Sequence, residues 1–232
     1  TGNNITIGSP VTLPQANVSG GQMILPKTNP STGNVIDEYW IIYHELLTNN
    51  FHVYELTAGG VSFVKKEAAG PNLTNCTGGG DVIAFMKSNG CYNQFAMSNN
   101  DKVNLFDFDT DDAQITFTNS QTVTAAYGIE FSPSGKKVFV TTGLTGGDAV
   151  DLYSIDVSPG GTGSNFGTPN RVGALWATQR GGAMQVGPDG KIYVGGMKNW
   201  GSYGSTEYMG VISDPDGSFS FDPQGVEIPA PG

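Results

Sequence analysis

Tyr127-Gly-Ile-Glu-Phe-Ser-Pro-Ser-Gly-Lys-Lys-Val-Phe-Val140 consists of an apolar strand, a Ser-Pro-Ser-Gly turn and a second apolar strand. The same order returns in Gly182-Ala-Met-Gln-Val-Gly-Pro-Asp-Gly-Lys-Ile-Tyr-Val194, where the turn is Gly-Pro-Asp-Gly. Proline presets φ at about −65° and glycine accepts a positive φ, so both turns reverse the chain tightly. A third apolar strand follows each hairpin. One such unit cannot bury its own apolar face, so we infer that several units stack on one another.

The turn glycines place these units at a regular spacing. Gly90, Gly135 and Gly190 are 45 and 55 residues apart, close to the roughly 40–50 residues of a four-stranded propeller blade. A less regular unit precedes them, with candidate strands at 22–25, 39–43 and 51–55. The sequence therefore predicts an all-β fold, a β-propeller of four-stranded antiparallel blades, with about four blades visible. The expected blades span about residues 21–70, 78–118, 126–176 and 181–229 of a single propeller domain or propeller segment, residues 1–232.

Residues 1–20 carry the pattern of one outer strand, Ile5-Thr-Ile7 with Val11-Thr-Leu13, without inner strands of its own. Two explanations stay open. Either this strand closes the ring by pairing with the last blade, or the chain is the C-terminal part of a larger propeller. The last blade already has an expected outer strand at Phe219-Ser-Phe221, which favours the second explanation. An open flank would then need a partner chain, because unpaired sheet surfaces associate readily.

Composition limits the classes of partner. Asp and Glu number 21 against 11 Lys and Arg, which gives a net charge of −10, and no basic run could neutralise phosphates. Nucleic acid is therefore not an expected partner. No stretch approaches the roughly 18 apolar residues of a membrane-spanning helix, so we expect no membrane span in this segment. The first residue, Thr1, follows no Met or apolar signal core, which suggests a processed product.

Cys76 and Cys91 flank one expected strand. A disulfide between them would close a short loop and stabilise the fold by about 3 kcal/mol. The alternative is two unpaired thiols. The acidic, Asn/Thr/Gly-rich composition suits an extracellular protein and favours the disulfide.

Several phrases of this chain resemble those of a known family. The phrases are Glu38-Tyr-Trp-Ile-Ile-Tyr-His-Glu-Leu46, Asn50-Phe-His-Val-Tyr-Glu-Leu56, Val103-Asn-Leu-Phe-Asp-Phe-Asp109, Met209-Gly-Val-Ile-Ser-Asp-Pro215 and the two hairpins quoted above. They resemble the WD-repeat-like β-propeller of large secreted surface proteins of the Bacteroidota, which commonly end in a gliding-motility-associated or type IX secretion sorting domain. The resemblance implies a propeller fold and an extracellular or cell-surface location. It implies little about activity, since such proteins are mostly uncharacterised or regarded as adhesive. Two departures are the Lys87-Ser-Asn-Gly-Cys91 turn of the second blade and the absence of a sorting domain from these residues.

In a propeller, the loops between second and third strands and the loops between blades lie on one rim, and the tight turns lie on the opposite face. The longest insertion on that rim is Lys198–Glu207, which places Trp200 and Tyr203 among small residues. Such a composition suits stacking on sugar rings or contacts with a protein. The alternative is that these aromatic side chains cover the core of their own blade. Asn199 and Arg180 are further candidates for ligand binding on the same rim.

The run Asp107-Phe-Asp-Thr-Asp-Asp112 is the second candidate site. Alternating carboxylates of Asp107, Asp109 and Asp111 could surround Ca²⁺ with hard oxygen ligands. The glycine and distal glutamate of an EF-hand loop are absent, so a solvated hairpin turn is the alternative. Ca²⁺ is the only cofactor that the sequence suggests.

No catalytic residues are assigned from the sequence. There are only two histidines, His44 and His52, and no nucleophile elbow, metal-binding histidine pair or phosphate-binding loop. Acidic side chains near a central channel, such as Glu130, could hold a metal as in propeller lactonases. Three functions are therefore considered: a secreted or cell-surface binding and adhesion module for protein or glycan, an assembly subunit that pairs with another chain through an open flank, and a metal-dependent hydrolase or lyase.

Overall fold

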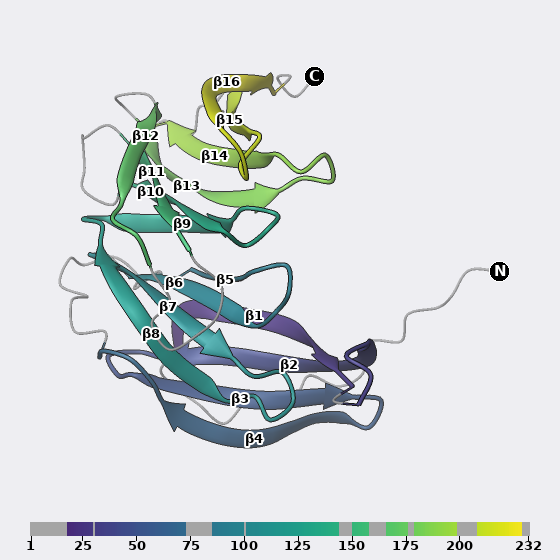
Figure 1. The fold of residues 1–232 in the computed structure, drawn as a ribbon. Helices are drawn as coiled ribbons and strands as arrows, with labels where there is room; N and C mark the ends of the chain where they lie inside the picture. Colours follow the sequence, from purple (N-terminus) through teal and green to yellow (C-terminus); the bar gives the residue numbers. More distant parts are fainter. Residues whose placement is uncertain are drawn as a thin grey trace.

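The computed structural model describes residues 18–29, 31–72, 85–99, 101–143, 150–157, 166–175, 179–198 and 208–228, with the backbone alone at 179–181 and 196–198. All regular secondary structure in these ranges is β-strand, in four four-stranded antiparallel sheets (Figure 1). Within the described ranges, no helix is long and apolar enough to cross a membrane.

Each sheet is one blade, and its strands follow one another along the chain. Blade 1 contains β1 (Val18–Thr28), β2 (Val35–Glu45), β3 (Asn50–Thr57) and β4 (Gly60–Ala68). Blade 2 contains β5 (Met86–Ser88), β6 (Gln94–Asn99), β7 (Lys102–Phe108) and β8 (Ile115–Thr122). Blade 3 contains β9 (Ala126–Phe131), β10 (Lys137–Thr142), β11 (Val150–Asp156) and β12 (Asn170–Leu175). Blade 4 contains β13 (Gln179–Val186), β14 (Ile192–Lys198), β15 (Tyr208–Ser213) and β16 (Ser220–Glu227).

The four blades are arranged as in a β-propeller. The first strands β1, β5, β9 and β13 lie toward the middle of the molecule, and the fourth strands β4, β8, β12 and β16 lie at its periphery (Figure 1). The predicted all-β propeller of four-stranded antiparallel blades is therefore confirmed. The pattern in residues 1–17 lies outside the described residues, so the two explanations for it stay open.

The predicted turns explain two of the four first hairpins. Gly135 and Gly190 have φ values of 74° and 76°, which side chains with a Cβ rarely adopt. In blade 2 the left-handed residue of this turn is Tyr92, with a φ of 58°, rather than Gly90. The second blade therefore reverses direction by a different turn, in agreement with its missing Ser-Pro-x-Gly sequence.

Three apolar cores fill the seams between consecutive blades. In the first seam, the Phe51 ring of blade 1 lies edge-on to Phe95 and Phe106 of blade 2, with ring centroids 5.8 and 5.2 Å apart. In the third seam, Phe139 of blade 3 meets Phe219 of blade 4 at 5.4 Å. Because each seam needs apolar side chains from two blades, no blade is stable alone.

The inner strands β9 and β13 approach each other closely because glycines face one another there. A Cβ added to Gly128 would lie 2.2 Å from the Gly182 carbonyl oxygen. The Thr141 hydroxyl donates to the same oxygen at 3.0 Å. Small residues thus let blades 3 and 4 meet at the axis.

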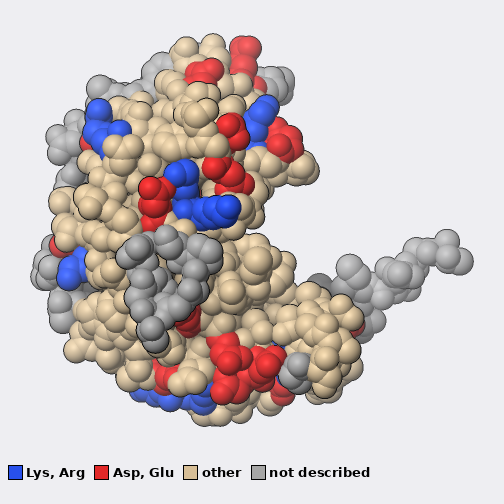
Figure 2. Space-filling view, viewed as in Figure 1, with Lys and Arg blue, Asp and Glu red and all other residues tan. Residues whose placement is uncertain are grey.

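The ring formed by these blades is open. Figure 2 shows a concave outline, with a hollow between the hairpin β9–β10, above, and the hairpin β5–β6, below. Blade 1 packs on blade 2, blade 2 on blade 3 and blade 3 on blade 4. Among the described residues no apolar core joins blade 4 to blade 1, so one sheet face of blade 1 and one of blade 4 have no neighbouring blade there.

Candidate functional site

The predicted rim site lies mostly outside the described residues. This applies to Asn199, Trp200 and Tyr203, and of Arg180 only the backbone, in β13, is described. A role for these four residues in ligand binding stays a prediction.

The predicted disulfide is also untested. Cys91 is exposed in the turn between β5 and β6 and is not bonded to another described residue. Cys76 lies outside the described residues, so the pairing stays a prediction.

The acidic run forms the turn between β7 and β8. Asp107 Oδ1 accepts a hydrogen bond from Gln94 Nε2 at 2.9 Å. Asp109 Oδ1 accepts from the Asp111 backbone N–H at 2.8 Å, and Asp112 caps the turn in the same way. The carboxylates thus bond to neighbouring groups of their own blade, as in a solvated turn. Among the described residues no three His, Cys, Asp or Glu side chains are placed to hold a metal ion, and the Ca²⁺ site stays a prediction.

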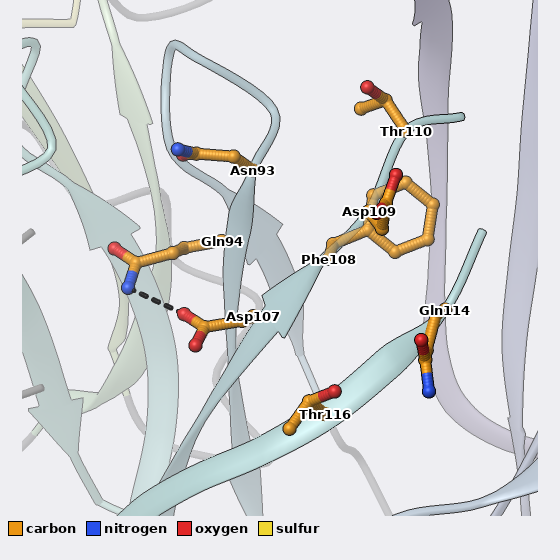
Figure 3. Close-up of a pocket in the computed structure, with 8 residues that line it drawn as sticks. All are labelled: Asn93, Gln94, Asp107, Phe108, Asp109, Thr110, Gln114 and Thr116. Carbon is orange, nitrogen blue, oxygen red and sulfur yellow. Dashed lines mark hydrogen bonds between the residues drawn. The ribbon is translucent and has the colours of Figure 1, made fainter. Parts of the chain in front are cut away.

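A hollow of about 590 Å³ lies beside this turn (Figure 3). It is lined by Asn93, Gln94, Asp107, Phe108, Asp109, Thr110, Gln114 and Thr116. All but Phe108 carry polar side chains, and Phe108 itself is buried. The hollow can therefore offer amide, hydroxyl and carboxylate groups to a polar ligand.

Blade 1 fixes the position of this hollow. Trp40 Nε1 donates to the Thr110 carbonyl oxygen at 2.9 Å, and the Thr28 and Thr110 hydroxyls are 2.7 Å apart. Because the hollow is built from tight turns, it lies on the face opposite the predicted rim. The sequence pointed to Asp107 and Asp109 as metal ligands, whereas the amides of Gln94 and Gln114 were not recognised.

At the propeller axis, three inner strands bring polar side chains together. Lys87 of β5 places Nζ 3.0 Å from Glu130 Oε2 of β9, and it donates to Gln185 Oε1 of β13 at 2.8 Å. Glu130 Oε1 accepts from the Phe131 backbone N–H. The cluster links blades 2, 3 and 4 through one ammonium group.

Burial raises the pKa of the Glu130 carboxyl, and Lys87 opposes this shift only in part. The sequence suggested that Glu130 could hold a metal in the central channel. The carboxylate is instead paired with the Lys87 cation. Neither Lys87 nor Gln185 carried a sequence signal, because their meeting depends on three separate blades.

Blade 1 has a second, largely apolar face on the side away from blade 2. Leu25, Ile42 and Val53 point into the core with blade 2, so the alternate residues of the same strands point the other way. Ile24 pairs with Ile41, Ile41 with Tyr54, and Tyr54 with Phe63; Tyr43 pairs with His52 in the next row. We call the surface formed by Ile24, Ile41, Tyr43, His52, Tyr54 and Phe63 the flank face.

The flank face has a buried centre and exposed edges. The His52 ring stacks on Tyr43 with centroids 4.8 Å apart, and Tyr54 contacts Phe63 edge-on at 5.3 Å. Ile24 at one edge is 62% exposed and Phe63 at the other is 53% exposed.

The described residues with large exposed apolar side chains are Val18, Ile24, Val35, Leu47, Phe63, Val64, Phe117, Val226 and Ile228. Six of these nine lie in blade 1, and two lie in or just after β16. Exposed apolar surface therefore concentrates at the two ends of the open ring.

No family model matches this chain, and no curated protein matches it either. Several solved structures match this chain. A functionally unknown protein from Desulfotomaculum acetoxidans is 17% identical with a TM-score of 0.53, over 90% of this chain and 56% of that one. A protein from Lactobacillus plantarum is 16% identical with a TM-score of 0.53, over 79% of this chain and 53% of that one.

A third structure, from Bacteroides uniformis, is described as "a putative 6-phosphogluconolactonase". It is 15% identical with a TM-score of 0.50, over 91% of this chain and 55% of that one. At such identities the likeness extends to the fold alone. The chain spans little more than half the length of each of these three structures.

Proposed function

We propose that this chain is an interaction module, and that its flank face pairs with blade 4 of a second copy. The observation that carries the proposal is the exposure of Ile24 and Phe63 at the edges of the flank face and of Val226 on blade 4. Monomeric proteins rarely expose large apolar patches, and such patches mark interaction sites. A further sheet would fit between the free face of blade 1 and the free face of blade 4.

Blade 4, at the other end of the open ring, offers a matching sheet. Met184, Ile192 and Ile212 of blade 4 point into the core with blade 3. Val211 therefore lies on the other face, paired with Tyr193, and Val226 on the same face is partly exposed. Tyr193 and Val226 thus provide aromatic and aliphatic surface against Ile24 and Phe63.

A second copy also suits the symmetry and the size. Each existing seam joins one face of a blade to the opposite face of the next, and blade 4 against blade 1 of another copy repeats that order. Two copies related by a twofold axis then form two identical junctions, and the ring closes. Each copy supplies one half of such a ring, similar to the 53–56% of the solved structures that this chain covers.

Sedimentation velocity tests this proposal. The loading concentrations should be about 10 to 100 μM, the range in which weak dimers form. We expect twice the 24.3 kDa chain mass. Ile24→Lys and Val226→Lys should each give monomers, because each places a charge in the junction. Leu47→Lys, at a residue that is 56% exposed in the turn after β2, is the matched control and should remain dimeric. A monomer at every concentration contradicts the proposal, and sensitivity to Ile24→Lys alone would mean that blade 1 meets blade 1.

A second candidate function is binding of a glycan, and it is favoured by the hollow beside β7. Amide and carboxylate side chains such as Gln94 and Asp107 are suited to sugar hydroxyls, which both donate and accept hydrogen bonds. This role agrees with a secreted or cell-surface location, which we retain as a proposal. The assignment to the Bacteroidota, to gliding motility and to type IX secretion rests on the sequence resemblance alone.

A glycan array comparing four variants tests this second function. Loss of binding in Gln94→Ala and Asp107→Ala would place the site in the hollow. Loss in Trp200→Ala and Tyr203→Ala would place it on the predicted rim. Binding that is absent from the wild-type protein, or equal in all four variants, contradicts the proposal.

A further inference from the structure

Three polar side chains lie at one end of the seam between blades 1 and 2. They are His44 of β2, Asn99 of β6 and Asn104 of β7. His44 and Asn104 are completely buried. The core of this seam is apolar, and the three residues form a polar group at one end of that core.

The strand registers place these side chains at the same seam. On blade 1, Trp40 and Ile42 point into the core with blade 2, and alternation continues this row to His44. On blade 2, Phe95 and Met97 point into the same core, and the row continues to Asn99. Both rows run toward the loops between second and third strands, so they end on the same rim.

Asn104 belongs to the same end. It pairs directly with Met97 across β6 and β7, and directly opposed residues point to the same face of a sheet. Phe51 connects the two blades here, since its ring centroid lies 4.8 Å from that of His44 and 5.2 Å from that of Phe106. Phe106 is the next residue on the same face of β7 after Asn104.

Several atoms of these side chains have no partner within hydrogen-bonding geometry among the described residues, although the Thr48 backbone lies near enough to His44 to raise its pKa slightly against the effect of burial. The unpaired buried atoms are His44 Nδ1 and Nε2, Asn99 Oδ1, and Asn104 Nδ2 and Oδ1. Burial of a polar group without a partner is costly, and the large majority of such groups in folded proteins bond to protein or to ordered water. Five unpaired polar atoms at one end of a seam therefore point to a shared hydrogen-bonding partner.

We propose that ordered internal water fills this position and joins blade 1 to blade 2 through His44, Asn99 and Asn104. Water both donates and accepts, and buried waters typically make about three hydrogen bonds to such groups. The unpaired atoms of His44, Asn99 and Asn104 include both hydrogen-bond donors and acceptors. Burial lowers the pKa of His44 to about 4, so its neutral ring has one donor and one acceptor nitrogen. A bound cation could not accept from the imidazole N–H or from the Asn104 amide, so it would leave those donors unpaired.

A crystal structure of the wild-type protein at a resolution that shows water is the direct test. We expect at least one solvent peak at about 2.7–3.2 Å from both His44 and an asparagine of blade 2. A dry seam contradicts the proposal. So does a direct hydrogen bond between His44 and Asn104, because no bridging molecule would then be needed.

A double-mutant cycle provides an independent test. His44→Phe and Asn104→Leu each remove one of the two polar groups and leave the other buried with fewer hydrogen bonds. Each should therefore reduce the folding equilibrium constant by about 5- to 100-fold. In the double variant, the reduction of the folding equilibrium constant should be smaller than the product of the two single reductions, since neither polar group remains. Independent effects of the two substitutions contradict a shared water. Asn119→Leu, on the exposed surface of β8, combined with His44→Phe is the control and should be additive.

Discussion

Lys87 and Glu130 form an ion pair between the inner strands of blades 2 and 3, with 3.0 Å between Nζ and Oε2. The Glu130 side chain is only 6% exposed and that of Lys87 is 27% exposed. The same ammonium reaches Gln185 of blade 4. One side chain therefore links the inner strands of three blades at the axis.

We expect Lys87→Met to lower the free energy of unfolding by about 3 kcal/mol at pH 7, because it leaves a buried carboxylate without its cation. Lys87→Met combined with Glu130→Leu should recover most of that loss. Urea denaturation measures both. Lys191→Met is the control, since its pair with Asp189 is largely exposed and should contribute little. An equal loss in the control would contradict the role assigned to burial.

The raised pKa of Glu130 predicts a pH dependence of stability. The folded state holds the proton at a pH where the unfolded chain has released it. Stability should therefore fall as pH rises from about 4.5, the unfolded value, through the raised folded pKa, and then remain level. The difference in unfolding free energy between wild type and Glu130→Gln, measured from pH 4 to 8, isolates this effect. A difference that is flat with pH would show that the pKa is not raised.

His44 predicts the opposite dependence. Its folded pKa of about 4 lies below the ordinary 6.5, so the unfolded chain binds the proton first as pH falls. About 3 kcal/mol of stability should be lost between pH 6.5 and 4. His44→Phe should abolish this part of the acid sensitivity, whatever its effect at neutral pH. If the variant and the wild type lose stability in parallel, His44 is not the group responsible.

Gly182 should not tolerate a side chain. A Cβ there would lie 1.5 Å from the Gly195 carbonyl oxygen, and backbone atoms cannot move aside without separating β13 from β14. We expect Gly182→Ala to cost more than about 3 kcal/mol or to prevent folding. Gly59→Ala, in the exposed turn between β3 and β4, has its nearest atom at 3.5 Å and should be nearly neutral. Thermal unfolding of the two variants compares them directly.

Local chemistry made much of the fold predictable. The Ser-Pro-Ser-Gly and Gly-Pro-Asp-Gly turns predicted the hairpins β9–β10 and β13–β14, because the positive φ of Gly135 and Gly190 is a property of the residue itself. The alternation of apolar residues predicted the strands in the same way. Blade 2 shows the limit, since its first hairpin turns through Tyr92 rather than Gly90.

The candidate sites were less predictable. The alternation of carboxylates along the sequence predicted Asp107 as a metal ligand. In the structure, Asp107 accepts a hydrogen bond from Gln94 of the neighbouring strand. Neither the partner of Glu130 nor the exposure of Ile24 and Phe63 has a local signature. Ile24 and Leu25 are equally apolar in the sequence, and only the packing of blade 2 on one of them distinguishes the two.

The amino-acid sequence alone thus determined the repeat, the turns and the antiparallel blades, because each depends on backbone preferences and side-chain alternation within about 50 residues. Only the tertiary structure decided which face of blade 1 is buried, that Lys87 meets Glu130 at the axis, and that His44 and Asn104 share a seam. These relationships join residues from different blades. They depend on how sheets stack in space, and such distances are not encoded in the spacing of residues along the chain.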